Sequence, residues 1–117
     1  MKTPKYTRAQ AMSLIPLLEG ITAEIHERRD HIDLLGNMIK SLAASAHVHG
    51  EDVKIRREEL RRERLELRRI GQELEGIGCH ITLTDPFEIF IPGIEDGYGW
   101  RPGEGFLRRS AIEPFAA

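Results

Sequence analysis

Two runs of apolar residues at heptad spacing constrain the fold of this chain more than any other feature. In the first run, apolar residues recur at alternating steps of three and four, a period of about 3.5 residues that is typical of a coiled-coil seam. The second run repeats every seven residues, with further apolar residues at its intermediate positions. The first run comprises Leu14, Leu18, Ile21, Ile25, Ile32, Leu35, Ile39 and Leu42, with Arg28 in the same seam, and the second Val53, Leu60, Leu67 and Leu74, with Ile70 and Ile77.

The segment between the two runs, residues 43–50, lacks the heptad pattern. A short connection of this kind makes two successive helices antiparallel. We therefore predict an antiparallel, coiled-coil-like helical hairpin over residues 7–76 that turns near His47 to Gly50. Thr7 and Gln10 have the spacing of a capping box at its start. Pro16 should bend the first helix near its beginning, because proline removes one helical hydrogen bond.

Beyond Gly78 the composition changes to residues typical of strands and turns. Short runs over 79–84, 87–91, 98–100 and 106–109 predict strands separated by Pro and Gly turns. A small antiparallel sheet is stable only with one face covered, and the apolar residues 14–21 offer a cover. The prediction is an α+β fold, mainly α, in a single domain over 1–117, with a β-rich tail over 79–110 packed on the N-terminal part of the first helix.

Composition excludes several classes of protein. The 117 residues carry 17 Lys plus Arg against 19 Asp plus Glu, a net charge of −2, which gives no general attraction to nucleic acid. The single cysteine, Cys79, excludes an internal disulfide, and we expect it to be buried. No apolar run approaches the ~18 residues of a membrane span, and the N-terminus does not resemble a signal peptide. We expect a cytoplasmic protein that makes no membrane contact.

The chain resembles a bacterial and archaeal family known only as a domain of unknown function, number twenty-two hundred and three in its series. The start matches a Thr-x-x-x-Ala-x-x-Leu-x-Pro-x-Leu pattern, and the tail matches a glycine, an aspartate, an apolar strand, an Asp-Gly turn and Trp-x-x-Gly-Glu. The resemblance implies a fold and no activity. The matching residues are Thr7, Ala11, Leu14, Pro16 and Leu18, then Gly78, Asp85, Phe90-Ile91-Pro92, Asp96-Gly97, and Trp100 with Gly103-Glu104.

The most specific local motif is Trp100, Arg101 and Glu104. A Pro-Gly turn between them would place Arg101 and Glu104 on one rim, where they could recognise a peptide or another partner. The competing interpretation, which we favour, is that Trp100 fills the core beneath the sheet and the glycine serves the turn.

The second helix carries a stripe of arginines: Arg57, Arg61, Arg64 and Arg68. Such a stripe could follow a phosphate backbone. Six acids share the segment 51–70, however, and no aromatic residue is interleaved for base stacking. We therefore expect the stripe to face a partner helix or solvent rather than nucleic acid.

Few residues suggest a metal or catalytic site, and we expect no cofactor. His47 and His49 are a weak candidate for a metal site that Glu51 or Asp52 could complete, and we favour the competing interpretation that they belong to a solvated polar loop. The acids and histidine at Glu24, Glu27, Asp30 and His31 are interpreted as solvated. Arg28 lies in the seam and needs a carboxylate, for which we expect Glu66 or Glu73.

These features predict a non-enzymatic interaction or assembly module. The alternative is a small ligand-binding or catalytic domain with its site near Trp100, Arg101 and Glu104. One hairpin covers only the facing sides of its helices, which leaves apolar residues such as Ile55 and Leu65 outside. We therefore expect a homodimer in which a second copy covers them.

Overall fold

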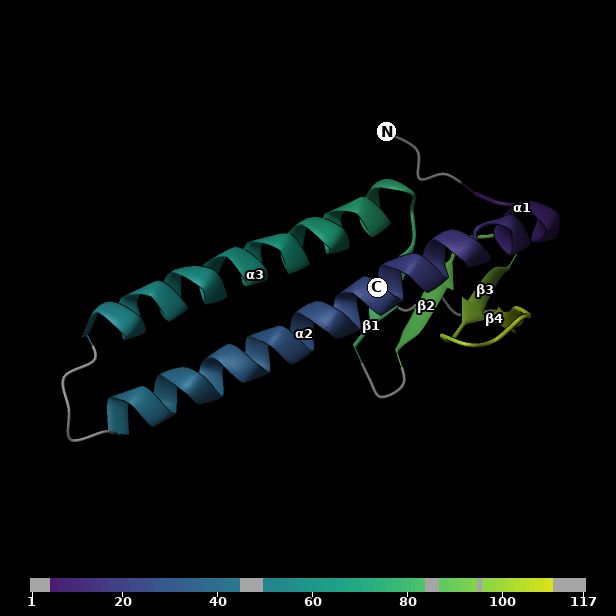
Figure 1. The fold of residues 1–117 in the computed structure, drawn as a ribbon. Coiled ribbons are helices and arrows are strands. Elements are labelled where there is room, and N and C mark those ends of the chain that lie inside the picture. The colour runs from purple at the N-terminus through teal and green to yellow at the C-terminus, as the bar shows by residue number, and fades with distance from the viewer. Residues whose placement is uncertain (1–4, 45–49, 84–86, 95, 111–117) are drawn as a thin grey trace. The chain divides into compact units, whose positions relative to one another are not determined.

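The computed structural model describes residues 5–83, 87–94 and 96–110, except for 45–49. The chain divides into two compact units, one formed by Met1–Ala23 with Gly71–Ala117 and the other by Glu24–Ile70. The predicted α+β class, mainly α, is confirmed, whereas the single domain over 1–117 stays a prediction. The helices are α1 (Arg8–Ser13), α2 (Ile15–Ala44) and α3 (Gly50–Gly76), and the strands are β1 (His80–Thr82), β2 (Glu88–Ile91), β3 (Gly97–Trp100) and β4 (Arg108–Ser110) (Figure 1).

The unit Glu24–Ile70 is a helical hairpin, in which α2 and α3 run antiparallel and side by side (Figure 1). Seam residues close the interface, since Ile25 and Leu35 are buried, and Leu60 and Leu67 are half-buried. The helices end at Ala44 and resume at Gly50, within the predicted connection, and the predicted hairpin is confirmed. The turn at His47 itself lies outside the described residues.

The N-terminal helix is interrupted rather than merely bent. The predicted capping box is present, because the Gln10 N–H donates to Thr7 Oγ1 at 3.2 Å and the Thr7 N–H donates to Gln10 Oε1 at 2.9 Å. Leu14 ends α1, and α2 begins one residue later. Pro16 lacks the N–H that would continue the ladder of α1, and a proline fits the first turn of a new helix.

The C-terminal end of α3 is closed by a glycine in the left-handed conformation. Gly78 has φ +81°. Its N–H donates to Glu75 O at 2.9 Å, and the next N–H, that of Cys79, donates to Leu74 O at 3.0 Å. These two bonds form a Schellman motif, which satisfies the last carbonyls of the helix and turns the chain toward β1.

Replacing Gly78 by Ala should lower the free energy of unfolding by about 1–2 kcal/mol, because a Cβ is strained at positive φ. Urea denaturation followed by circular dichroism measures the change. The matched control is Gly76→Ala, at a helical position with no atom within 4 Å of the added methyl, which should be neutral or stabilising. Equal effects of the two substitutions would contradict the role assigned to Gly78.

The four strands form an antiparallel sheet in the order β1-β2-β3-β4. Alternate residues of β2, Ile89 and Ile91, are fully buried, as is Trp100 at the end of β3. On the other face of β2, the Phe90 ring packs against Gly97, where even a methyl group would overlap it. The predicted sheet is therefore confirmed, although Thr84 and the turn at Asp85-Pro86 lie outside the described residues.

Tyr6 connects the N-terminal segment to the sheet within the same unit. Its N–H donates to Pro92 O at 2.9 Å, and the Ile94 N–H donates to Tyr6 O at 3.2 Å, so that Tyr6 forms a parallel bridge with Gly93. The Tyr6 hydroxyl donates to Ile77 O at 2.7 Å, just beyond α3. Burial raises the pKa of this hydroxyl, and its proton is held by the Ile77 carbonyl.

Candidate functional site

The candidate rim of the sheet has one buried and two surface members. Trp100 is fully buried, and its Nε1–H donates to Glu104 O at 2.8 Å. Between them Gly103 adopts φ +87°, which permits the tight turn. The Trp100 indole therefore packs in the core of the sheet, whereas Arg101 is exposed and Glu104 half-buried at its edge.

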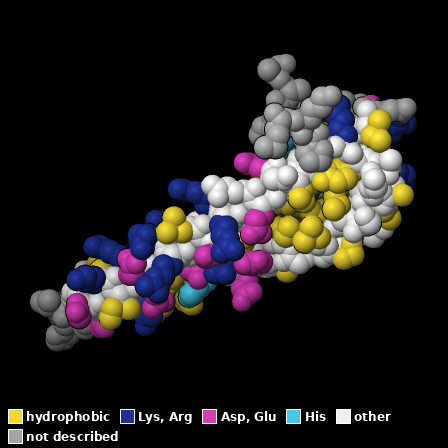
Figure 2. All heavy atoms as spheres, turned by 90° about the horizontal axis from the view of Figure 1, so that it is seen from above, with side chains coloured by type: hydrophobic (Ala, Val, Ile, Leu, Met, Phe, Trp, Pro, Cys, Tyr) yellow, Lys and Arg dark blue, Asp and Glu magenta, His cyan; other side chains and the backbone are white. Residues whose placement is uncertain are grey.

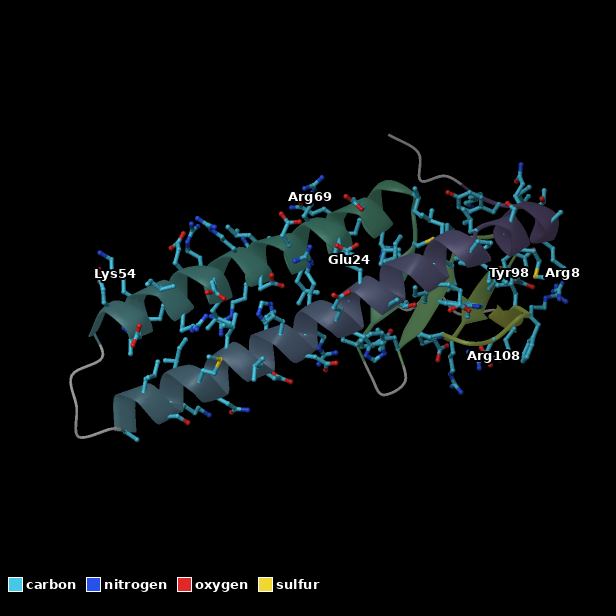
Figure 3. All side chains as sticks on the ribbon, in the orientation of Figure 1. Arg8, Glu24, Lys54, Arg69, Tyr98 and Arg108 are labelled. Carbon is cyan, nitrogen blue, oxygen red and sulfur yellow. The ribbon has the colours of Figure 1, made fainter. Side chains whose placement is uncertain are left out.

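At this edge the charged groups neutralise one another. The Arg101 N–H donates to Glu104 Oε1 at 2.9 Å, and the Arg101 guanidinium lies 3.4 Å from Glu88. Arg108, on β4 (Figure 3), lies 3.4 Å from Glu104 and 3.7 Å from Glu88. Two arginines and two glutamates thus form one network. Both carboxylates are already paired with arginine side chains of the protein itself.

The seam of the hairpin contains a polar layer centred on Arg28. Its Nη1 lies 3.1 Å from both carboxylate oxygens of Glu63, and its Nη2 lies 3.3 Å from Glu24 Oε1. His31 Nδ1 lies 3.5 Å from Glu63 Oε1. The expectation that Glu66 or Glu73 pairs with Arg28 is wrong: Glu63 is the carboxylate in the facing seam position. Hydrogen bonding to Glu63 raises the pKa of the Arg28 guanidinium.

This polar layer surrounds a hollow of about 300 Å³ lined by Glu24, Glu27, Arg28, His31 and Glu63. Glu24 and His31, interpreted from the sequence as solvated, are therefore part of an ion-pair cluster. No group of three or more potential metal ligands occurs among the described residues. We assign this cluster a structural role, because the guanidinium of Arg28 is paired with the carboxylates of Glu24 and Glu63.

Neutralising one partner should destabilise the hairpin, whereas removing both should not. We expect Glu63→Gln to lower the free energy of unfolding by about 1 kcal/mol, since Arg28 then loses its bidentate acceptor. The double variant Arg28→Leu with Glu63→Leu should equal or exceed the wild type, because it continues the apolar seam. Thermal or urea unfolding measures both changes, and a double variant less stable than Glu63→Gln would contradict this account.

The predicted stripe of arginines lies on the surface of α3. Arg61 pairs with Glu58 at 2.6 Å, one turn away on the same helix. The other three arginines have no ion pair with any described residue. All four line a groove of about 550 Å³ between α2 and α3. The helical surface displays basic, acidic and apolar side chains side by side (Figure 2).

The acidic residues on the opposite flank of α3 are matched by basic residues of the same helix. Glu59 lies 2.9 Å from Arg56, and Glu66 lies 3.7 Å from Arg69, both at a spacing of three residues. Pairs at this spacing lie next to each other on a helix surface. The two sides of the hairpin therefore differ: acids are paired on one side, and unpaired cations accumulate on the other.

The remaining candidates from the sequence are Cys79, His47 and His49. Cys79 is a free, buried cysteine, as expected, and burial raises the pKa of its thiol to about 12. A thiol with this pKa stays protonated at neutral pH and is a poor nucleophile. The weak metal candidates His47 and His49 lie outside the described residues.

The raised pKa of Cys79 makes stability depend on pH in the alkaline range. The unfolded thiol ionises near its ordinary pKa of 9.0, whereas the folded thiol keeps its proton up to about 12. Its contribution is therefore complete below pH 9 and is lost as the pH rises toward 12. Unfolding free energies measured across this range should fall more steeply for the wild type than for Cys79→Ala. Parallel slopes would contradict the burial of this thiol.

The fold and these surfaces define a class: a mainly helical α+β protein with a helical hairpin and a small antiparallel sheet. No helix in the described part of the chain is long and apolar enough to cross a membrane. Comparisons with family models, with curated proteins and with solved structures found no match for the chain.

Proposed function

We propose that this chain is a cytoplasmic, non-enzymatic interaction module whose helical hairpin self-associates as a homodimer. The observation that carries the proposal is the exposure of large apolar side chains on the outer faces of the hairpin. Leu34 on α2 is 55% exposed and Ile55 on α3 is 53% exposed. Covering such side chains contributes about 25 cal/mol per Å² of apolar surface. The free buried Cys79 fits a reducing compartment.

Leu34 and Ile55 occupy equivalent places in the two helices. Each follows a seam residue by two positions, Ile32 in α2 and Val53 in α3. Equivalent heptad positions fall on the same side of an antiparallel pair. Met38, which is half-buried, belongs to this side as well and lines a hollow of about 440 Å³ with Leu42. This side, defined by Leu34, Met38 and Ile55, is the proposed dimer face.

Leu65 belongs to a different surface. From the sequence we expected a second copy to cover Leu65 together with Ile55. In the structure, Leu65 lines the groove that contains the arginine stripe. Apolar groups therefore emerge on two sides of the hairpin, and we assign the dimer to the side where the acids are already paired within the helix. Symmetric contact through that side brings no row of unpaired like charges together.

The sheet edge supports a binding role less well. The ligand-binding or catalytic alternative would use Arg101 and Glu104, which already bind each other and their neighbours Glu88 and Arg108. A ligand there would have to replace these ion pairs.

We also propose membership in the domain-of-unknown-function family that the sequence resembles, which brings no activity with it.

Glutamate at both central positions of the dimer face, Leu34→Glu with Ile55→Glu, should convert the dimer to a monomer without unfolding it. Two charges would then be buried against a second copy, which is strongly unfavourable. Sedimentation equilibrium at micromolar concentration should give twice the monomer mass of 13.3 kDa for the wild type and 13.3 kDa for the variant. Circular dichroism checks that the helices persist.

The matched control is Leu83→Glu with Ile94→Glu, which makes the same change at exposed residues of the other unit. This control should remain dimeric. A wild-type mass of 13.3 kDa throughout the concentration range would refute the proposal, and a monomeric control would move the interface to the tail.

A further inference from the structure

The groove of the arginine stripe has an unusual lining. Five cationic side chains surround it: Lys40 from α2, and Arg57, Arg61, Arg64 and Arg68 from α3. No carboxylate is among its lining residues. On the face of the hairpin drawn in Figure 2, by contrast, acidic and basic side chains lie side by side. The groove is therefore a local concentration of positive charge on a chain whose net charge is −2.

The floor of the groove is apolar and open. Ile39 from α2 and Leu60 and Leu65 from α3 line it, and Leu65 is 46% exposed. Gly36 lines it too, and a Cβ added at this position would meet no atom within 4 Å. The missing side chain at Gly36 leaves room beside the apolar floor. A ligand that fits must combine negative charge with apolar groups.

The spacing of the cations indicates the shape of that ligand. The four arginines follow one another at steps of four, three and four residues, so they form a line along one face of α3. This line is about 17 Å long, at 1.5 Å per residue. A second helix packed alongside would present carboxylates to it at the same repeat, and apolar side chains to the floor.

We propose that this groove binds an acidic amphipathic helix of a partner protein. The inference rests on the proposed function as an interaction module. It assigns a partner to the side of the hairpin that carries the arginine stripe, opposite the proposed dimer face. Arg57, Arg64 and Arg68 have no ion pair with a described residue, so an incoming carboxylate gains a salt bridge without breaking one in the hairpin. Only Arg61 must share its guanidinium with Glu58.

Two other occupants fit the groove less well. Nucleic acid would satisfy the cations but not the apolar floor, and residues 24–70 contain no Phe, Tyr or Trp for stacking on bases. A second copy docked symmetrically through this groove would bring five cations of one chain against five of the other, which is repulsive.

The test uses a synthetic helical peptide of about 20 residues, which matches the length of the groove with a turn to spare at each end. Leucine recurs in it every three or four residues, and glutamate flanks both sides. The control peptide has glutamine in place of glutamate. Fluorescence anisotropy of the labelled peptides, titrated with the full chain, should show binding of the acidic peptide only, and added salt should weaken it.

Two variants locate the binding. Arg64→Glu with Arg68→Glu should weaken the affinity at least about tenfold, because attraction becomes repulsion. The control, Arg62→Glu with Arg69→Glu, makes the same charge change on exposed α3 residues outside the groove lining, where it removes their surface ion pairs with Glu58 and Glu66. It should retain most of the affinity. Gly36→Leu should fill the floor and also weaken binding about tenfold, whereas Gly36→Ala should bind nearly as the wild type does.

Equal weakening by the two charge variants, or no binding of the acidic peptide to the wild type, would overturn the inference. Tighter binding of a labelled DNA or RNA duplex than of the peptide would assign the groove to nucleic acid instead. The dimer is tested separately, since the Leu34→Glu with Ile55→Glu variant should bind the acidic peptide as the wild type does. If the wild type is dimeric but does not bind the acidic peptide, the proposal for the groove is refuted and the proposal of a homodimer still stands.

Discussion

The polar layer formed by Arg28 and Glu63 is the interaction on which the register of the hairpin depends. An apolar seam alone tolerates a shift of one heptad, because leucine and isoleucine pack against one another at several registers. A guanidinium in the seam is different, since it is stable only where a carboxylate faces it. Arg28 has two such partners, Glu63 across the interface and Glu24 one turn earlier in α2. The level of every other seam residue follows from this pairing.

The register also decides which residues of α2 meet the charges of α3, whereas ion pairs within α3 form whatever the register. On one side, Glu59 and Glu66 each find an arginine three residues away along α3. On the other side, the arginine stripe meets Gly36 and Lys40 of α2, neither of which offers a carboxylate. A slip of one heptad would change which α2 residues meet the stripe. The cationic groove is thus a property of the pairing and not of α3 alone.

Much of the fold could be predicted from the sequence, because heptad spacing and glycine or proline punctuation act over short distances. The interruption at Leu14 was harder, since Pro16 acts on the turn before it and two successive helices have the same apolar pattern as one bent helix. Periodicity assigns Arg28 to the seam, but it does not show which residue of α3 lies opposite. The prediction that Glu66 or Glu73 pairs with Arg28 was therefore wrong. The bridge from Tyr6 to Gly93 joins residues far apart in the sequence and has no local signal.

For the candidate site, the sequence identified the arginine stripe but not its groove. The groove also needs residues of the other helix, among them Gly36 of α2, and the position of Gly36 opposite the stripe depends on how the two helices pair. Glycine in a helix interior costs up to about 1 kcal/mol relative to alanine. Here the added methyl would meet no neighbour, so no close packing requires the glycine at this position. In the proposed complex, an apolar side chain of the partner helix would enter the open space at Gly36, with the arginines of the stripe beside it.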